Sequence, residues 1–331
     1  MNSGQQRTAP LGEFQLIERF FKRSTTATSY VALGVGDDCA LLQVRADEQW
    51  AVSIDTLIEG VHFLNDVDAG ALGHKALAVN LSDLAACGAT PRCFFLALAL
   101  PSVDEAWLER FARSLHALAD EHACVLAGGD TTRSPSGVSI TITALGTVPT
   151  GGALLRSGAQ VGDDLWVSGE LGDATLGLAY RRGEIELLMS EVQKVVARLE
   201  RPTPRVQLGE RLRTIATSAI DISDGLLGDL RHILKASAVG ARIEWTAVPR
   251  SAVLRAQPMP FQQRCALAGG DDYELLFAAP HARRAEVAAI GASIDVPLTR
   301  IGTASASTDL VVLDEHGAPV ETDARAFDHF R

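Results

Sequence analysis

The stretch Leu77-Ala-Val-Asn-Leu-Ser-Asp-Leu-Ala-Ala-Cys-Gly-Ala-Thr-Pro91 decides how this chain folds. Aliphatic and small residues recur at helical spacing from Leu72 to Cys87, and Gly88 and Pro91 then act as stop signals. Because the segment is apolar almost all round, we expect it to form a buried helix.

Three polar side chains interrupt this apolar helix: Asn80, Ser82 and Asp83. A buried carboxylate without a partner is costly or stays protonated, so a charged Asp83 needs a base or a metal ion. Lys75 is the only base in the run, two turns away. In the alternative interpretation, Asp83 only caps or hydrogen-bonds neighbouring backbone. The motif by itself leaves both interpretations open.

Length and composition set the broad class. The chain has 331 residues, 47% of them hydrophobic, with a net charge of −11, so we expect two globular domains. Its apolar runs are too short for a bilayer, and the N-terminal residues lack a signal-peptide layout. Five scattered cysteines without a C-x-x-C motif indicate a reducing cytoplasm. No Lys/Arg cluster appears, so we expect neither a nucleic-acid nor a membrane partner.

Residues that favour turns are concentrated between Pro149 and Gly152, and we place the domain boundary there. Residues 1–150 should be a sheet-forming domain, since strand patterns occur at Ala51–Leu57, Cys93–Leu100 and Val138–Val148. Residues 151–331 alternate strand and helix signals. We therefore predict an α/β (α+β) protein of two domains.

Between the strands, one sequence pattern indicates where a helix begins. Ser102-Val-Asp-Glu105 reads as a capping box, which predicts a helix running to about His122. Its apolar stripe includes Trp107, Phe111 and Leu115, as expected of a helix that only packs.

Glycines precede carboxylates at several strand ends, as in Gly128-Gly-Asp130 and Gly269-Gly-Asp-Asp272. Ser53 and Asp55 have the two-residue spacing that places both side chains on one face of a strand. Taken singly, each element is also compatible with an ordinary turn. Together the carboxylates at the ends of apolar segments predict a site for several metal ions, typically Mg²⁺ carrying nucleotide phosphates; they are Asp38, Asp55, Asp83, Asp130, Asp221 and Asp224.

Two further patterns narrow the function. Val79–Leu84 and Ile220–Gly225 share the order aliphatic-x-aliphatic-Ser-Asp, which is compatible with a duplicated half. The chain contains no Walker A motif, no G-x-G-x-x-G after a strand, and no kinase H-R-D or D-F-G set. A nucleotide enzyme of this kind is therefore neither a P-loop protein nor a protein kinase.

The ordered set of motifs resembles the thiamine-monophosphate kinase family over essentially the whole chain. The matching segments are Gly12-Glu-Phe14 with Leu16-Ile17, Gly34-Val-Gly-Asp-Asp-Cys-Ala40, Ser53-Ile-Asp55, Glu59-Gly-Val-His-Phe63, Val79-Asn-Leu-Ser-Asp-Leu-Ala85, Gly128-Gly-Asp-Thr-Thr132, Arg156-Ser-Gly158, Ile220-Asp-Ile-Ser-Asp-Gly225, Gly269-Gly-Asp-Asp-Tyr-Glu-Leu275 and Phe327-Asp-His-Phe330.

The resemblance implies an aminoimidazole-ribonucleotide-synthetase-like fold, a homodimer, and ATP-dependent, Mg-assisted phosphorylation of thiamine phosphate to thiamine diphosphate. It implies that residues 1–150 bind ATP and Mg²⁺ and dimerise, and that residues 151–331 complete the nucleotide and substrate site. The implied ligands of several Mg²⁺ ions are Asp38, Ser53, Ile54 (through its backbone), Asp55, Asp83, Asp130, Asp221 and Asp224. Of these, the residues implied in catalysis are Asp38, Asp55, Asp83, Asp130 and Asp224.

The resemblance also implies the contacts of the two substrates. ATP would contact Gly129, Asp130, Arg156 and Ser223, and thiamine phosphate would contact His62, Asp271 and Phe327. Three positions depart from the family pattern: Ile54 stands where Thr is frequent, Asp271 where Glu is usual, and Phe327 where Tyr or Trp is common. Two alternatives stay open, namely a non-catalytic Mg-ATP sensor and another ATP-using enzyme of the same superfamily.

Overall fold

The computed structural model describes residues 12–23, 28–35 and 39–320. Two compact units share the chain. The first contains Ile54–Leu77, Arg92–Ala144 and the residues before Arg45, and the second contains Arg45–Ser53, Ala78–Pro91 and the residues from Leu145 onward. Helices and sheets are mixed throughout, so the predicted α/β class is confirmed.

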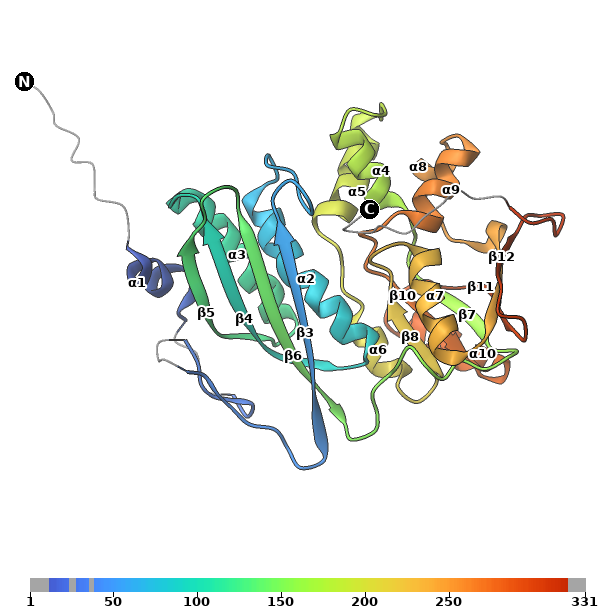
Figure 1. Ribbon diagram of the computed structural model, residues 1–331, viewed down its shortest axis with the longest axis horizontal. Helices are drawn as coiled ribbons and strands as arrows, with labels where there is room; N and C mark the ends of the chain where they lie inside the picture. Colours follow the sequence, from blue (N-terminus) through green and yellow to red (C-terminus); the bar gives the residue numbers. More distant parts are fainter. Residues whose placement is uncertain (1–11, 24–27, 36–38, 321–331) are drawn as a thin grey trace, which may run out of the picture. The chain divides into compact units, whose positions relative to one another are not determined.

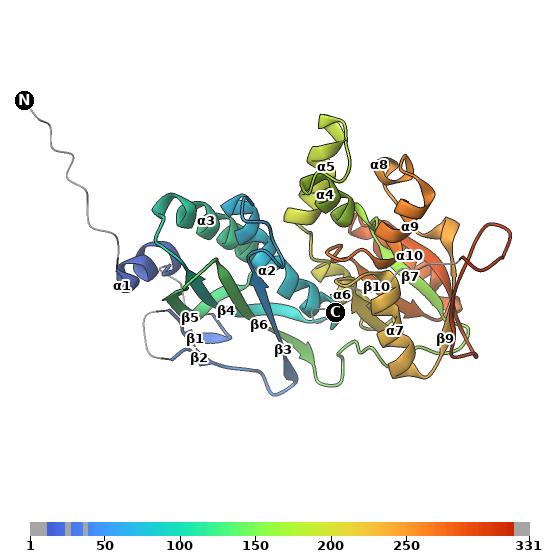
Figure 2. The same ribbon diagram turned by 45° about the horizontal axis from the view of Figure 1, so that its top comes forward.

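A four-stranded sheet with order β3-β6-β4-β5 forms the N-terminal half. Helices α2 and α3 lie over one of its faces (Figures 1 and 2). The elements of this half are α1 (Glu13–Leu16), the π-helix η1 (Ile17–Phe21), β1 (Val31–Leu33), β2 (Leu41–Leu42), β3 (Glu48–Ile58), α2 (Ala69–Ala86), β4 (Thr90–Leu100), α3 (Glu105–Glu121), β5 (Val125–Arg133) and β6 (Ser139–Pro149).

The predicted buried helix is α2, which begins three residues earlier than the apolar pattern indicated. Its polar residues Lys75, Asn80 and Ser82 are buried, whereas Asp83 is half-buried. Gly73 allows close packing, since a Cβ there would lie 2.2 Å from the carbonyl oxygen of Phe111 on α3. The helix is therefore packed against its neighbours on nearly every side, as an apolar surface requires.

One predicted helix start is wrong in detail. The N-cap of α3 is Asp104 rather than Ser102, and the Asp104 Oδ1 accepts hydrogen bonds from the backbone N–H groups of Ala106 and Trp107. Both residues are good caps, but the carboxylate also favours the positive end of the helix dipole.

The C-terminal half contains a six-stranded sheet with order β12-β9-β11-β7-β10-β8, antiparallel except between β12 and β9. Helices α7 and α10 lie on opposite faces of this sheet (Figures 1 and 2). Its elements are β7 (Asp164–Ser168), α4 (Asp173–Arg181), α5 (Met189–Glu200), α6 (Val206–Leu212), β8 (Ser218–Asp221), α7 (Leu226–Ser237), β9 (Gly240–Glu244), η2 (Trp245–Ala247), α8 (Ala252–Arg255), α9 (Met259–Ala268), β10 (Leu275–Ala279), η3 (His281–Arg283), α10 (Arg284–Ser293), β11 (Leu298–Ser305) and β12 (Leu310–Leu313).

The central strands β7 and β10 are buried along their whole length, which explains the apolar residues 165–167 of β7 and the fully apolar sequence of β10. Across them the rings of Trp166 and Phe277 stack with centroids 6.4 Å apart. After β7 come two helices, α4 and α5, which pack against each other. Within the part of the chain that the structure describes, no helix has the length and apolar character needed to cross a membrane.

A buried carboxylate ties the start of β7 to two other elements. Asp164, 1% exposed, accepts two hydrogen bonds from Arg284 of α10, at 2.6 and 2.7 Å, and one from Arg300 of β11 at 2.8 Å. Burial by itself raises the pKa of Asp164, but the two guanidinium groups outweigh it and hold the pKa below its usual value.

We expect Asp164→Asn to lower the free energy of unfolding by about 2–3 kcal/mol at pH 7, because two charge-assisted interactions are lost from a buried site. A lowered folded-state pKa stabilises the protein above the unfolded value near 3.9, and the stabilisation is lost as pH falls through the folded pKa. Urea titrations should therefore show a smaller difference between variant and wild type below about pH 4.

The matched control is Glu286→Gln on α10, which removes an exposed ion pair with Arg283. Such a pair contributes at most about 1 kcal/mol, so the control should stay close to wild type. Equal effects of the two substitutions at pH 7 would contradict the role of Asp164.

Candidate active site

Two loops of the second unit lie side by side at the ends of β8 and β10. Residues 222–225 follow β8, and residues 269–274 precede β10. Three backbone hydrogen bonds join them: Ile222 N–H to Glu274 O at 2.8 Å, Tyr273 N–H to Ile222 O at 2.8 Å, and Asp271 N–H to Ser223 O at 2.9 Å. This pairing brings three sequence-predicted site residues together, namely Ser223, Asp224 and Asp271.

Glycines make this close approach of the two loops possible. A Cβ on Gly270 would lie 2.4 Å from the carbonyl oxygen of Ser223, and one on Gly225 would lie 2.7 Å from the carbonyl carbon of Ala268. Gly225 also has φ +109°, a conformation that other residues rarely adopt. The glycines next to the carboxylates are therefore required by backbone packing.

Asp229, which the sequence pattern did not single out, contacts the same 222–225 loop. It lies in the first turn of α7, is 3% exposed, and accepts hydrogen bonds from the backbone N–H groups of Ser223 and Asp224, both at 3.1 Å. Burial and the nearby Asp224 raise the pKa of Asp229 to about 7, against the opposing effect of the two N–H groups and Arg156. Its place four residues after Gly225, where a carboxylate suits a helix N-terminus, was an available signal.

The C-terminal end of α2 contributes two hydrogen bonds to the same unit. The Ser82 Oγ donates to the Asp221 Oδ2 at 2.8 Å, and the Ser53 Oγ donates to the Asp83 Oδ2. Three sequence-predicted site residues, Ser53, Asp83 and Asp221, are thus linked through one turn of α2. The Asp83 carboxylate contacts a side chain, so it does not serve only as a backbone cap.

The similar segments 79–84 and 220–225 are not a structural repeat. The first is helical within α2, whereas the second is the end of β8 followed by a loop. The shared pattern, which was compatible with a duplicated half, therefore does not mark equivalent elements at this position. The two Ser-Asp segments are instead partners, since Ser82 of one donates to Asp221 of the other.

A buried ionic network lies behind the 269–274 loop, and the sequence reasoning missed it. Glu274 is fully buried and pairs with Arg198 of α5 at 2.7 Å and with Arg205 at 2.6 Å. Its other partner is the Ser168 Oγ, which donates at 2.5 Å. The neighbouring Asp272 accepts the Gly172 N–H at the start of α4, and burial raises the pKa of Asp272 well above its usual value. The two buried carboxylates of this loop thus differ in their partners: Glu274 is paired with two arginines, whereas Asp272 is held by a backbone N–H.

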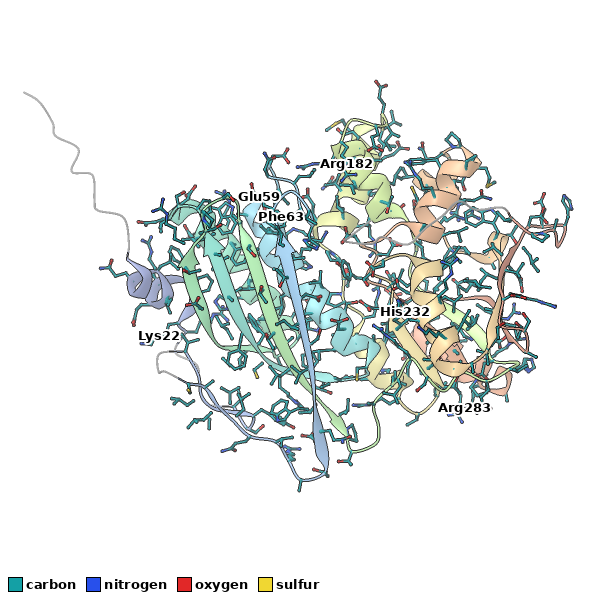
Figure 3. All side chains as sticks on the ribbon, viewed as in Figure 1. Lys22, Glu59, Phe63, Arg182, His232 and Arg283 are labelled. Carbon is teal, nitrogen blue, oxygen red and sulfur yellow. The ribbon has the colours of Figure 1, made fainter. Side chains whose placement is uncertain are left out.

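The first unit contains a cavity of about 840 Å³, which is lined by further residues of the sequence-predicted site. Gly129 and Asp130 of β5 line it, together with Gly34 and with Glu18 and Lys22 of the N-terminal region. Figure 3 labels Lys22. Gly129 lets β5 run against β4, since a Cβ there would lie 1.9 Å from the Leu96 carbonyl oxygen. Gly129 and Asp130 lie within the strand, not after it as the sequence pattern indicated.

The remaining predicted residues lie as follows. Along β3 the half-buried Ser53 and Asp55 share one face, and the exposed Ile54 side chain lies on the other. The His62 Nδ1 accepts the Ile58 N–H at 3.0 Å, in a turn flanked by Glu59 and Phe63 (Figure 3). Arg156 is exposed. Asp38 and Phe327 lie outside the described residues.

The oxygen atoms of these residues suit Mg²⁺. Among the described residues, no three His, Cys, Asp or Glu side chains are close enough to hold a metal ion by themselves. Mg²⁺ in nucleotide enzymes uses one or two carboxylates together with the phosphates, not a cage made only of protein. Carboxylates such as Asp83 and Asp221, each accepting a serine hydroxyl, fit that kind of site.

Comparisons with known proteins identify the family. Residues 36–148 match the N-terminal domain of AIR synthase related proteins, and residues 160–315 match the C-terminal domain. The thiamine-monophosphate kinase of Escherichia coli K12 is 46% identical over 96% of this chain and 98% of its own length.

Solved structures agree with this assignment. The crystal structure of thiamine-monophosphate kinase from Stenotrophomonas maltophilia K279a has a TM-score of 0.82 at 46% identity, covering 88% of this chain and 93% of that one. AaThiL complexed with AMPPCP and TMP has a TM-score of 0.76 at 29% identity, covering 87% and 89%. The predicted two-domain fold is confirmed, and this chain belongs to the thiamine-monophosphate kinase family of AIR synthase related proteins.

Proposed function

We propose that this chain transfers the γ-phosphoryl group of ATP to thiamine phosphate. The product is thiamine diphosphate, and the reaction is a step of thiamine diphosphate biosynthesis in the cytoplasm. The observation that carries the proposal is the family membership over nearly the full length. AaThiL, a relative of the same fold, holds AMPPCP and TMP together, as a direct transfer between a nucleotide and a phosphate acceptor requires.

The proposed ligands of the Mg²⁺ ions are Asp38, Ser53, Ile54, Asp55, Asp83, Asp130, Asp221 and Asp224. Two contacts support this assignment: the Ser53 hydroxyl fixes the Asp83 carboxylate, and the Ser82 hydroxyl fixes Asp221. Fixed ligands lose little freedom when an ion binds. Ile54 would act through its carbonyl oxygen, because its side chain is apolar.

Substrate contacts form the second part of the proposal. Gly129, Asp130, Arg156 and Ser223 would contact ATP, and the cavity beside Gly129 and Asp130 supports the first two. His62, Asp271 and Phe327 would contact thiamine phosphate. The His62 Nδ1 accepts the Ile58 N–H at 3.0 Å, which restricts the orientation of the imidazole ring.

The chemistry needs positioning and charge stabilisation more than acid–base catalysis. The acceptor oxygen of thiamine phosphate is anionic at neutral pH, so no strong general base is required. Bound Mg²⁺ supplies positive charge that offsets the repulsion between the two phosphates. The protein's own residues would hold donor and acceptor in line, and Arg156 and backbone N–H groups would offset phosphate charge.

The two halves of the chain have different proposed roles. Residues 1–150 would bind ATP and Mg²⁺ and form a homodimer, and residues 151–331 would supply the remaining nucleotide and substrate contacts. The dimer proposal is supported by the apolar face of β3, where Val52, Ile54 and Ile58 are 60%, 65% and 43% exposed. Apolar surface of this kind is typical of an interface.

The function itself is tested by incubating the purified protein with Mg-ATP and thiamine phosphate. We expect thiamine diphosphate and ADP to form in equal amounts. No ADP should form when thiamine phosphate is left out. ATP binding without any product would favour a sensor, and ADP formed without thiamine diphosphate would favour another enzyme of the superfamily.

We expect Asp83→Asn to abolish nearly all turnover while the fold stays intact. Asn keeps the size and can still accept the Ser53 hydroxyl, but it lacks the charge that would hold Mg²⁺. The melting temperature without metal should hold or rise, because a partly buried charge is removed. Thermal melts with and without Mg-ATP, beside the turnover assay, measure both effects.

Asp68→Asn is the matched control. Asp68 lies exposed at the other end of α2 and accepts the Ala71 N–H at 2.9 Å, which an Asn side chain can also do. It should keep wild-type turnover. Full activity of Asp83→Asn with normal Mg²⁺ dependence would show that Asp83 is no metal ligand.

For the dimer, we expect light scattering at micromolar concentration to give twice the chain mass. Val52→Lys should shift the protein toward the monomer, because it places a charge on the apolar face of β3. Val103→Lys is the control, since Val103 is also exposed, at 40%, but lies in the loop before α3. A wild-type monomer would contradict the proposal.

A further inference from the structure

The loop between α9 and β10 has an unusual backbone. Five non-glycine residues in the described chain have positive φ, and three of them, Ala123, Ala238 and Asp295, lie within two residues of a helix end, where this conformation is common. The other two, Asp271 at φ +68° and Tyr273 at +51°, lie in this loop. Such a conformation is costly for a bulky residue and persists only where the surroundings impose it.

The surroundings hold this loop on both sides. The backbone N–H groups of Asp271 and Tyr273 donate to the 222–225 loop. The side chains of the neighbouring Asp272 and Glu274 are buried. Asp272 accepts a hydrogen bond from the Gly172 N–H, and Glu274 forms ion pairs with Arg198 and Arg205. The inward-facing carboxylates thus fix the residues whose backbone is strained.

Because the side chains of Asp272 and Glu274 face inward, those of Asp271 and Tyr273 lie on the other side of the loop, where they contact each other. The Tyr273 hydroxyl donates to the Asp271 Oδ1 at 3.1 Å. Tyr273 is 8% exposed and Asp271 is half-buried, so the hydrogen bond lies at the edge of the interior. A phenol in that position restricts the rotation of a short carboxylate side chain.

We propose that Tyr273 is a positioning residue for thiamine phosphate, which acts by holding the Asp271 carboxylate in the orientation that meets the substrate. The inference rests on the proposed function and adds to it a determinant of substrate affinity. Thiamine phosphate carries a cationic thiazolium ring and an aminopyrimidine, both of which a carboxylate can recognise. Asp is one methylene shorter than Glu, so its reach depends more on a fixed orientation.

The test is Tyr273→Phe, which removes one oxygen and leaves the ring and backbone. We expect KM for thiamine phosphate to rise about 3- to 10-fold, as the loss of one hydrogen bond implies. The kcat, the KM for ATP and the melting temperature should stay close to wild type. Tyr180→Phe, at a partly buried tyrosine of α4, is the control and should change none of these values.

A double-mutant cycle with Asp271→Ala separates positioning from packing. If Tyr273 acts through Asp271, Tyr273→Phe should have no further effect on KM in the Asp271→Ala background. Independent, multiplying effects would overturn the proposal, as would an unchanged KM in Tyr273→Phe. A lower melting temperature with both KM values raised would indicate a structural role and also overturn it.

Calorimetric titration of thiamine phosphate into each protein keeps this test separate from that of the proposed function. A wild type that makes thiamine diphosphate, with Tyr273→Phe binding thiamine phosphate equally well, contradicts only the role of Tyr273. A wild type that neither binds nor phosphorylates thiamine phosphate contradicts the proposed function, and the positioning role with it.

Discussion

The polar side chains on α2 impose the constraint on which the site depends. A helix that is buried nearly all round cannot leave a hydroxyl or carboxylate without a hydrogen-bonding partner. Ser82 meets this requirement by donating to Asp221 at the end of β8, and Asp83 meets it by accepting from Ser53 on β3. The same two hydrogen bonds that allow α2 to be buried therefore fix the orientation of two carboxylates proposed as metal ligands.

Negative charge is distributed unevenly around the 222–225 and 269–274 loops. Glu274 and Asp164 each face two arginines and serve the stability of the sheet. Asp229 instead accepts hydrogen bonds from two backbone N–H groups, and burial together with the nearby Asp224 raises its pKa. Carboxylates held close together are unfavourable until positive charge arrives, which is the electrostatic condition for a site that takes Mg²⁺ with a nucleotide.

The sequence predicted secondary structure correctly where a hydrophobic pattern extended over many residues. The apolar period of α2 and the alternation in β6 predicted both elements to within a few residues, because burial on one or all faces leaves a repeating signature. The exact residue at which a helix begins was predicted less well. Asp104 caps α3 although Ser102 has the matching spacing.

The sequence by itself determined the fold class, the family and the list of carboxylates beside glycines, because these depend on residue type and spacing along the chain. Only the tertiary structure decided which of them meet. Ser82 and Asp221 are 139 positions apart, and Glu274 and Arg198 are 76 apart, so no local pattern encodes either contact. The left-handed conformation of Tyr273 is likewise against its own preference. It is imposed by the paired loops and by the buried Glu274, and so is visible only once the chain is folded.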